Sequence, residues 1–126
     1  HKAITTDHVA AFQGLCNDWA GWKGLDGTAG HAEKVDGGRG CAELVTDRML
    51  NCHLAVECSL SQVGPLSRAL LEAFCVATVE EDRPMEWRGL VQKVTGEGRD
   101  REQRQIAVYA FEELRIVKQG GYSRAA

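Results

Sequence analysis

Cysteine and histidine are the residues of this chain best suited to chemistry, because they bind metals and act as nucleophiles or bases. The five cysteines fall at irregular intervals, at Cys16, Cys41, Cys52, Cys58 and Cys75. No C-x-x-C pair occurs, so the spacing favours neither a disulfide framework nor a zinc ribbon. Cys52 and His53 are adjacent and would point about 100° apart on a helix, which makes them poor partners for one metal. We expect free, buried cysteines in a reducing cytoplasm, and no metal or cofactor.

Motifs of catalysis are missing from the sequence. The histidines are His1, His8, His31 and His53, and no H-E-x-x-H or G-x-S-x-G pattern occurs. Six glycines lie between residues 24 and 40, but no G-x-x-x-x-G-K-[ST] loop that would cradle a phosphate is present. A cysteine–histidine dyad assembled in space stays open. No residue is singled out as catalytic, and the prediction is a protein that is not an enzyme.

Arginine is the remaining residue type with a functional pattern. The net charge is −3, yet residues 1–82 hold six basic and twelve acidic residues, a net charge of −6. Residues 83–126 hold nine basic and six acidic residues, a net charge of +3. Such asymmetry is typical of a chain in which one part contacts nucleic acid, although a solvated surface produces the same pattern.

The elements that position these residues are predicted to be helices. A chain of 126 residues has the length of one domain, and its low aromatic content of 6% disfavours a β-sandwich or barrel. No apolar run approaches the ~18–20 residues that cross a bilayer. We expect one all-α, cytoplasmic domain over residues 1–126, with an N-terminal helix and a glycine-rich loop in 1–40 and a helical core in 41–126. The first residue is His1, as expected of a tag remnant or an excised fragment.

About five helices follow from the spacing of apolar residues, over residues 7–22, 42–62, 65–79, 84–94 and 100–118. The first two have apolar stripes at Val9, Phe12, Leu15, Cys16 and Trp19 and at Val45, Met49, Cys52, Val56 and Leu60. Gly64 and Pro65 separate the second helix from the third. The third is apolar on most sides and is therefore predicted to be the central, buried helix.

The last two predicted helices form a helix-turn-helix at about 84–118, joined by a turn in which Gly96 or Gly98 has a positive φ. In the last helix the predicted buried stripe consists of Ile106, Tyr109, Ala110, Leu114 and Val117. Several arginines point the opposite way, near the N-terminal end that a recognition helix presents to bases and phosphates. The candidate DNA-binding residues are Lys93, Arg99, Arg101, Arg104, Gln105, Val108 and Arg115.

The stretch from Val63 to Val117 resembles the C-terminal helix-turn-helix of sigma factors and of phage-related bacterial regulators. The likeness lies in Gly64-Pro65-Leu66-Ser67, Leu70-Leu71, Trp87-Arg88, Leu90-Val91 and Thr95-Gly96-Glu97-Gly98. The composition also resembles that of gene-transfer-agent regulators. The resemblance implies a DNA-binding transcriptional regulator, with RNA polymerase as a further partner.

Two other functions fit the same pattern. One is a protein-interaction module of a transcription complex that makes no DNA contact. The other is a phage packaging component similar to a small terminase. In the DNA-binding regulator, the acidic N-terminal half is expected to form a homodimer or to bind another protein, because DNA repels it.

Overall fold

The computed structural model of the chain describes residues 3–26, 45–83, 87–96 and 100–120, without the side chains of residues 87, 88, 100 and 101. Within these ranges the chain is all-helical, as predicted, and no described residue belongs to a strand. The α-helices are α1 (Thr6–Lys23), α3 (Asp47–Leu60), α4 (Pro65–Cys75), α5 (Trp87–Thr95) and α6 (Asp100–Lys118). The π-helix η2 (Val76–Glu80) continues α4. The predicted glycine-rich loop lies almost wholly outside the described residues.

Helix α1 begins where Thr5 caps it. The hydroxyl of Thr5 accepts a hydrogen bond from the backbone N–H of His8 at 3.1 Å, and Nδ1 of His8 accepts one from the backbone N–H of Thr5 at 3.1 Å. The helix ends at Gly24, whose φ of +73° is left-handed. Its buried side chains include Phe12, Leu15 and Trp19, as the predicted stripe requires.

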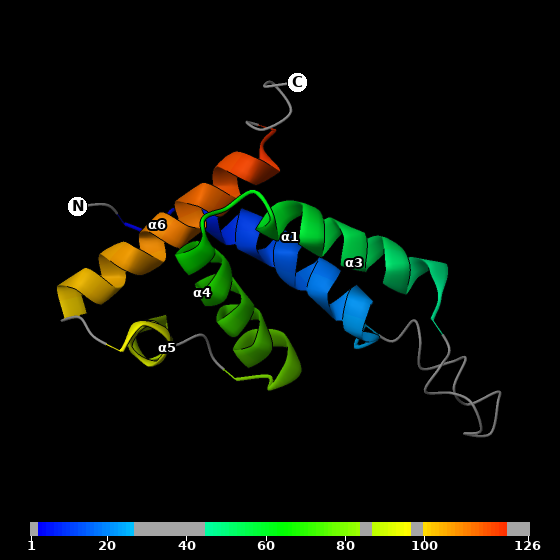
Figure 1. The fold of residues 1–126 in the computed structure, drawn as a ribbon, viewed down its shortest axis with the longest axis horizontal. Coiled ribbons are helices and arrows are strands. Elements are labelled where there is room, and N and C mark those ends of the chain that lie inside the picture. The colour runs from blue at the N-terminus through cyan, green and yellow to red at the C-terminus, as the bar shows by residue number, and fades with distance from the viewer. Residues whose placement is uncertain (1–2, 27–44, 84–86, 97–99, 121–126) are drawn as a thin grey trace.

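Helix α3 lies beside α1 and runs antiparallel to it (Figure 1). It begins at Asp47 rather than near residue 42, because Thr46 caps it by accepting from the backbone N–H of Met49. Cys52, Val56 and Leu60 are buried as predicted. The two helices approach closely at Gly21, where a Cβ atom would collide with the sulfur of Cys52.

Two residues of the predicted apolar stripes are on the surface. Val9 of α1 is 45% exposed and Val45, which precedes α3, is 59% exposed. The stripe of α1 is narrower than its apolar pattern because α1 packs chiefly against α3 and α6. Val45 lies ahead of the Thr46 cap and is therefore not part of a helical face.

Helix α4 begins at Pro65 as predicted and is central to the core. Leu70, Leu71, Phe74 and Cys75 have no measurable exposure. The ring of Phe74 contacts those of Phe12 from α1 and Phe111 from α6, with centroids 6.4 and 5.4 Å apart. These three rings join the N-terminal helix hairpin to the C-terminal half of the chain.

The third helix, predicted over residues 65–79, extends to Glu80. Its last five residues form the π-helix η2. At the end of this segment a carboxylate oxygen of Glu80 accepts a hydrogen bond from Trp19 Nε1 at 2.7 Å. This bond satisfies the indole N–H of a tryptophan that is only 5% exposed.

Candidate nucleic-acid interface

Helices α4, α5 and α6 form a three-helix unit in which each helix packs against the other two. In Figure 1, α5 is viewed along its axis while α6 runs across the picture, so the two helices cross steeply. Among the residues of α5 whose side chains are described, Val91 is fully buried. The side-chain amide of Gln103 donates a hydrogen bond to the amide oxygen of Gln92, which ties the start of α6 to the middle of α5.

A glycine ends α5 as predicted. Gly96 has a φ of +78°, and its backbone N–H donates to the carbonyl oxygen of Gln92 at 2.7 Å. A Cβ atom at Gly96 would meet nothing within 4 Å, so only its backbone conformation requires glycine. Gly98, the second candidate for this conformation, lies outside the described residues. A helix-turn-helix formed by α5, α6 and the segment between them therefore stays a prediction.

The bounds predicted for α6 are correct, but the predicted buried face is rotated. Val108, a candidate for the exposed DNA-binding face, is 4% exposed, whereas Tyr109 of the predicted buried stripe is 63% exposed. The buried side chains of α6 among those described are Gln103, Ala107, Val108, Ala110, Phe111 and Leu114. At 100° per residue their centre lies roughly 90° from Ile106.

The cause of this rotation is the number of neighbours. Helix α6 packs against α1, α4 and α5 and comes close to α3, so its buried face is wider than the single stripe of a surface helix. Val108 is thereby removed from the list of residues that could touch DNA in this conformation. The face that α6 presents to solvent carries Gln105, Tyr109 and Ile116.

Two of the predicted DNA-binding residues, Arg104 and Gln105, are exposed near the N-terminal end of α6. Lys93 is exposed on α5. Gln92 and Gln103, which bond to each other, directly precede Lys93 and Arg104 in the sequence, so the two cations belong to neighbouring parts of α5 and α6. Arg99 and the side chain of Arg101 lie outside the described part of the chain.

Arg115, the last of the predicted residues, is engaged within the protein. Its guanidinium donates to both carboxylate oxygens of Glu112, at 2.9 and 2.6 Å, and to the amide oxygen of Gln119 at 2.6 Å. Together with a hydrogen bond from His8, this contact lowers the pKa of Glu112 to about 2. Lys118, one turn further along, is 3.3 Å from the carboxylate of Asp18 on α1. The positive charge at this end of α6 is therefore largely compensated.

His8 has both ring nitrogens in use. Nδ1 accepts from the backbone of Thr5, so the proton is on Nε2, which lies 2.7 Å from a carboxylate oxygen of Glu112. The side chain is buried, at 4% exposure. The geometry makes His8 a link between the start of α1 and the C-terminal half of α6, rather than a base with a free lone pair.

The neighbouring residues Cys52 and His53 lie in different surroundings on α3. Cys52 is buried under Gly21, whereas the ring of His53 stacks on Trp22 with centroids 4.5 Å apart. Cys58 is exposed, contrary to the expectation of buried cysteines, and accepts a weak hydrogen bond from Gln62. In the described ranges no three histidine, cysteine or acidic side chains gather in a way that could hold a metal ion.

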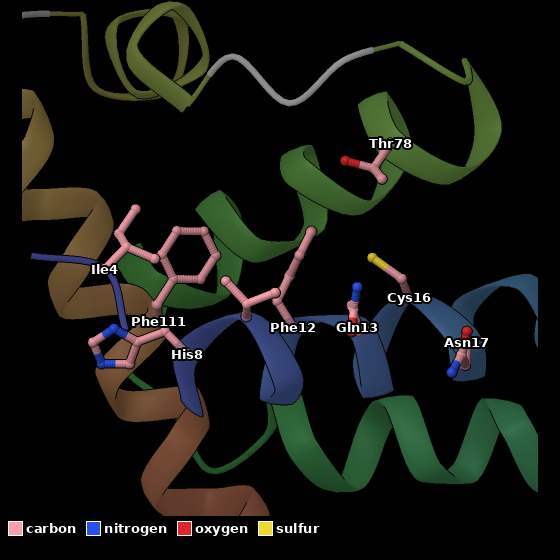
Figure 2. A pocket seen from close by; sticks show the side chains of 9 residues that line it. Ile4, His8, Phe12, Gln13, Cys16, Asn17, Thr78 and Phe111 are labelled. Atoms are coloured by element: carbon pink, nitrogen blue, oxygen red, sulfur yellow. The ribbon is translucent and has the colours of Figure 1, made fainter. Parts of the chain in front are cut away.

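A cavity of about 510 Å³, which the sequence did not predict, opens along α1 (Figure 2). Ile4, Val9, Phe12 and Phe111 contribute apolar wall, and Cys16 lines the same space. The polar residues along it are His8, Gln13, Asn17 and Thr78. The sequence does indicate one wall of this cavity. Val9, Gln13 and Asn17 are spaced by four residues, so one apolar and two amide side chains lie along one ridge of a helix.

Comparison of the chain with protein-family models, curated proteins and solved structures gave no match. Of the helices described, none combines the length and the apolar character needed to span a membrane. The fold of the described residues is that of a small all-helical protein.

Proposed function

We propose that the protein is a DNA-binding transcriptional regulator that contacts DNA with α5 and the N-terminal end of α6. The observation that carries this proposal is the exposure of Arg104, Gln105 and Lys93 on two helices that pack together on α4. An arginine fork suits both guanine edges and phosphate oxygens, and a helix N-terminus favours phosphate.

The distribution of charge along α6 also favours its N-terminal end as the part that contacts DNA. Arg115 and Lys118, toward the C-terminal end of α6, face Glu112 and Asp18. Arg104 forms no ion pair among the described residues, and its charge is available to an external anion. Arg99 and Arg101 add charge to this end in the sequence. The proposed interface therefore consists of Lys93, Arg99, Arg101, Arg104 and Gln105.

A second candidate function is a protein-interaction module without DNA contact, such as a part of a transcription complex that touches RNA polymerase. The observation that favours it is the apolar character of the solvent face of α6, where Tyr109 is 63% and Ile116 is 45% exposed. Exposed aromatic and aliphatic side chains on one helix face are a common basis for binding a protein partner.

A DNA titration at two salt concentrations separates the two functions. Phosphate contacts make the affinity fall with salt, with a log–log slope of roughly −0.9 per contact. We expect Arg101→Ala combined with Arg104→Ala to remove DNA binding and to leave the melting temperature nearly unchanged. Arg48→Ala is the control, because Arg48 is exposed on α3 and pairs with Asp26. Absence of any salt-dependent binding by the parent protein would reject the DNA-binding function and leave the protein-interaction function.

A further inference from the structure

The cavity along α1 has no part in the proposed DNA contact. Its volume of about 510 Å³ is within the range of roughly 300–1,000 Å³ that small-molecule sites occupy. Helices α1 and α6 and the π-helix η2 all contribute to its wall, so segments from both halves of the chain build it. No described residue of that wall is among the residues proposed to contact DNA.

One end of the cavity is apolar. Figure 2 shows Ile4, His8 and Phe111 at this end. Phe12 continues the wall, and its ring centroid is 5.5 Å from that of Phe111. Both ring nitrogens of His8 are already engaged within the protein, so this residue adds little polarity. Ile4 and the neighbouring wall residue Val9 are 37% and 45% exposed, and a bound molecule would cover apolar surface that now faces water.

The other end of the cavity is polar. Cys16, Asn17 and Thr78 lie there in Figure 2. Gln13 precedes Asn17 by about one helical turn, and both are exposed, so their amides can exchange hydrogen bonds with a bound molecule. The wall from Val9 to Asn17 is about 12 Å long, at a helical rise of 1.5 Å per residue. A molecule that fits this cavity is therefore elongated, with one apolar end and one polar end.

The wall of the cavity also restricts the charge of the molecule. Its described part contains no lysine, arginine, aspartate or glutamate. A charged head group would therefore lose hydration without gaining a counter-ion. An anion would in addition be repelled by the net negative charge of residues 1–82. These features favour a molecule without net charge.

We propose that the cavity binds a neutral, elongated small molecule that has an apolar tail and a hydroxyl or amide head group. The tail lies against Phe12, Phe111 and the exposed side of Val9, where burial of apolar surface supplies affinity. The head group forms hydrogen bonds with Gln13 and Asn17, which fix its orientation. The proposal is independent of the DNA-binding function, because this binding is measured without DNA.

Displacement of N-phenylnaphthylamine, an uncharged dye that fluoresces in apolar surroundings, tests the site in the full chain. The parent protein should bind the dye saturably, at one molecule per chain. Octanamide, octanoate and octylammonium have the same tail length and differ in head-group charge at pH 7. We expect octanamide to displace the dye at a concentration at least about five-fold lower than either ion. Absence of saturable dye binding, or equal displacement by either ion, would overturn the proposal.

A pair of matched variants locates the bound dye. Val9→Asp places a carboxylate on the cavity wall, and Val45→Asp makes the same change at a valine that is 59% exposed and precedes α3. Both variants should keep the circular dichroism spectrum of the parent, because both valines are on the surface. We expect Val9→Asp to weaken dye binding about ten-fold and Val45→Asp to leave it unchanged. Equal dye affinity of the two variants would show that the dye binds elsewhere. The competition among the three head groups uses the parent alone and stays decisive if either variant is unstable.

The head-group contacts have their own test. Gln13→Ala combined with Asn17→Ala removes both amides from exposed positions of α1, where alanine favours the helix. We expect this double variant to bind the dye like the parent and to bind octanamide several-fold more weakly. Asn51→Ala, at an exposed position of α3, is the control and should change neither affinity. An unchanged octanamide affinity in the double variant would contradict the proposed position of the head group.

Discussion

Replacement of Gly21 by alanine tests the packing of α1 on α3 with a single methyl group. A Cβ atom at this position would lie closer to the Cys52 sulfur than non-bonded atoms approach in real proteins, and 3.1 Å from Cys52 Cβ. Either the Cys52 side chain or one of the two helices must therefore move. Overpacking of this kind costs about 1–3 kcal/mol, and the better helix propensity of alanine offsets roughly 0.5–1 kcal/mol of it. We expect Gly21→Ala to lower the free energy of unfolding by about 0.5–2 kcal/mol.

The matched control is Gly14→Ala, in the same helix. A Cβ atom there would meet only the end of the flexible Lys118 side chain, at 3.6 Å. The substitution should raise the free energy of unfolding by about 0.5–1 kcal/mol through helix propensity alone. Urea denaturation followed by circular dichroism measures both variants on one scale.

A double-mutant cycle identifies the colliding partner. Cys52→Ala removes the sulfur that the new methyl group would strike, so Gly21→Ala combined with Cys52→Ala should be more stable than the sum of the single changes predicts, by about 1 kcal/mol or more. If Gly21→Ala is as stable as Gly14→Ala, or if the two changes are additive, the packing of α1 on α3 is not as described.

Three further changes test the turn, the acid response and the face of α6. Gly96→Val should destabilise the protein by about 1–2 kcal/mol more than Gly96→Asn, because a β-branched residue resists the left-handed backbone. Equal denaturation midpoints for the two variants would mean that the backbone at this position is not left-handed. Hydrogen bonds from Arg115 and then His8 hold the pKa of Glu112 at about 2, below its unfolded value of about 4.3. The ionised carboxylate therefore stabilises the fold above about pH 4.3, and this stabilisation is lost as the pH falls toward 2. In melting curves between pH 6 and pH 2, Glu112→Gln should melt lower than the parent at pH 6, and its melting temperature should fall less on acidification. Val108→Lys should lower the melting temperature strongly because it buries an unpaired charge. A melting temperature near that of the parent would mean that the side of α6 that carries Val108 is exposed to solvent.

The helix bounds that the sequence predicts well are those with strong local signals. Gly64 and Pro65 mark the start of α4, and Gly96 ends α5, because these residues constrain the backbone regardless of tertiary contacts. Asp100 to Lys118 is a long periodic segment, and its predicted bounds agree with those of α6.

Features that depend on neighbouring helices could not be predicted in this way. The apolar periodicity of α6 admits more than one buried direction, and the contacts with α1, α4 and α5 select the one that covers Val108 and exposes Tyr109. The hydrogen bond from Trp19 to Glu80 joins residues far apart in sequence. The engagement of Arg115 by Glu112 has a local signal in its three-residue spacing, which the prediction of an arginine face did not use.

The most direct measurement of the proposed function compares the salt dependence of DNA affinity for Arg104→Ala and Arg115→Ala. Both substitutions remove one arginine from α6, but Arg104 is exposed near the proposed interface and Arg115 is held by Glu112. If α5 and the N-terminal end of α6 contact DNA, Arg104→Ala weakens binding and reduces the log–log salt slope by about one unit, while Arg115→Ala leaves the slope unchanged. Equal slopes for the parent and both variants, or a loss confined to Arg115→Ala, would contradict that account.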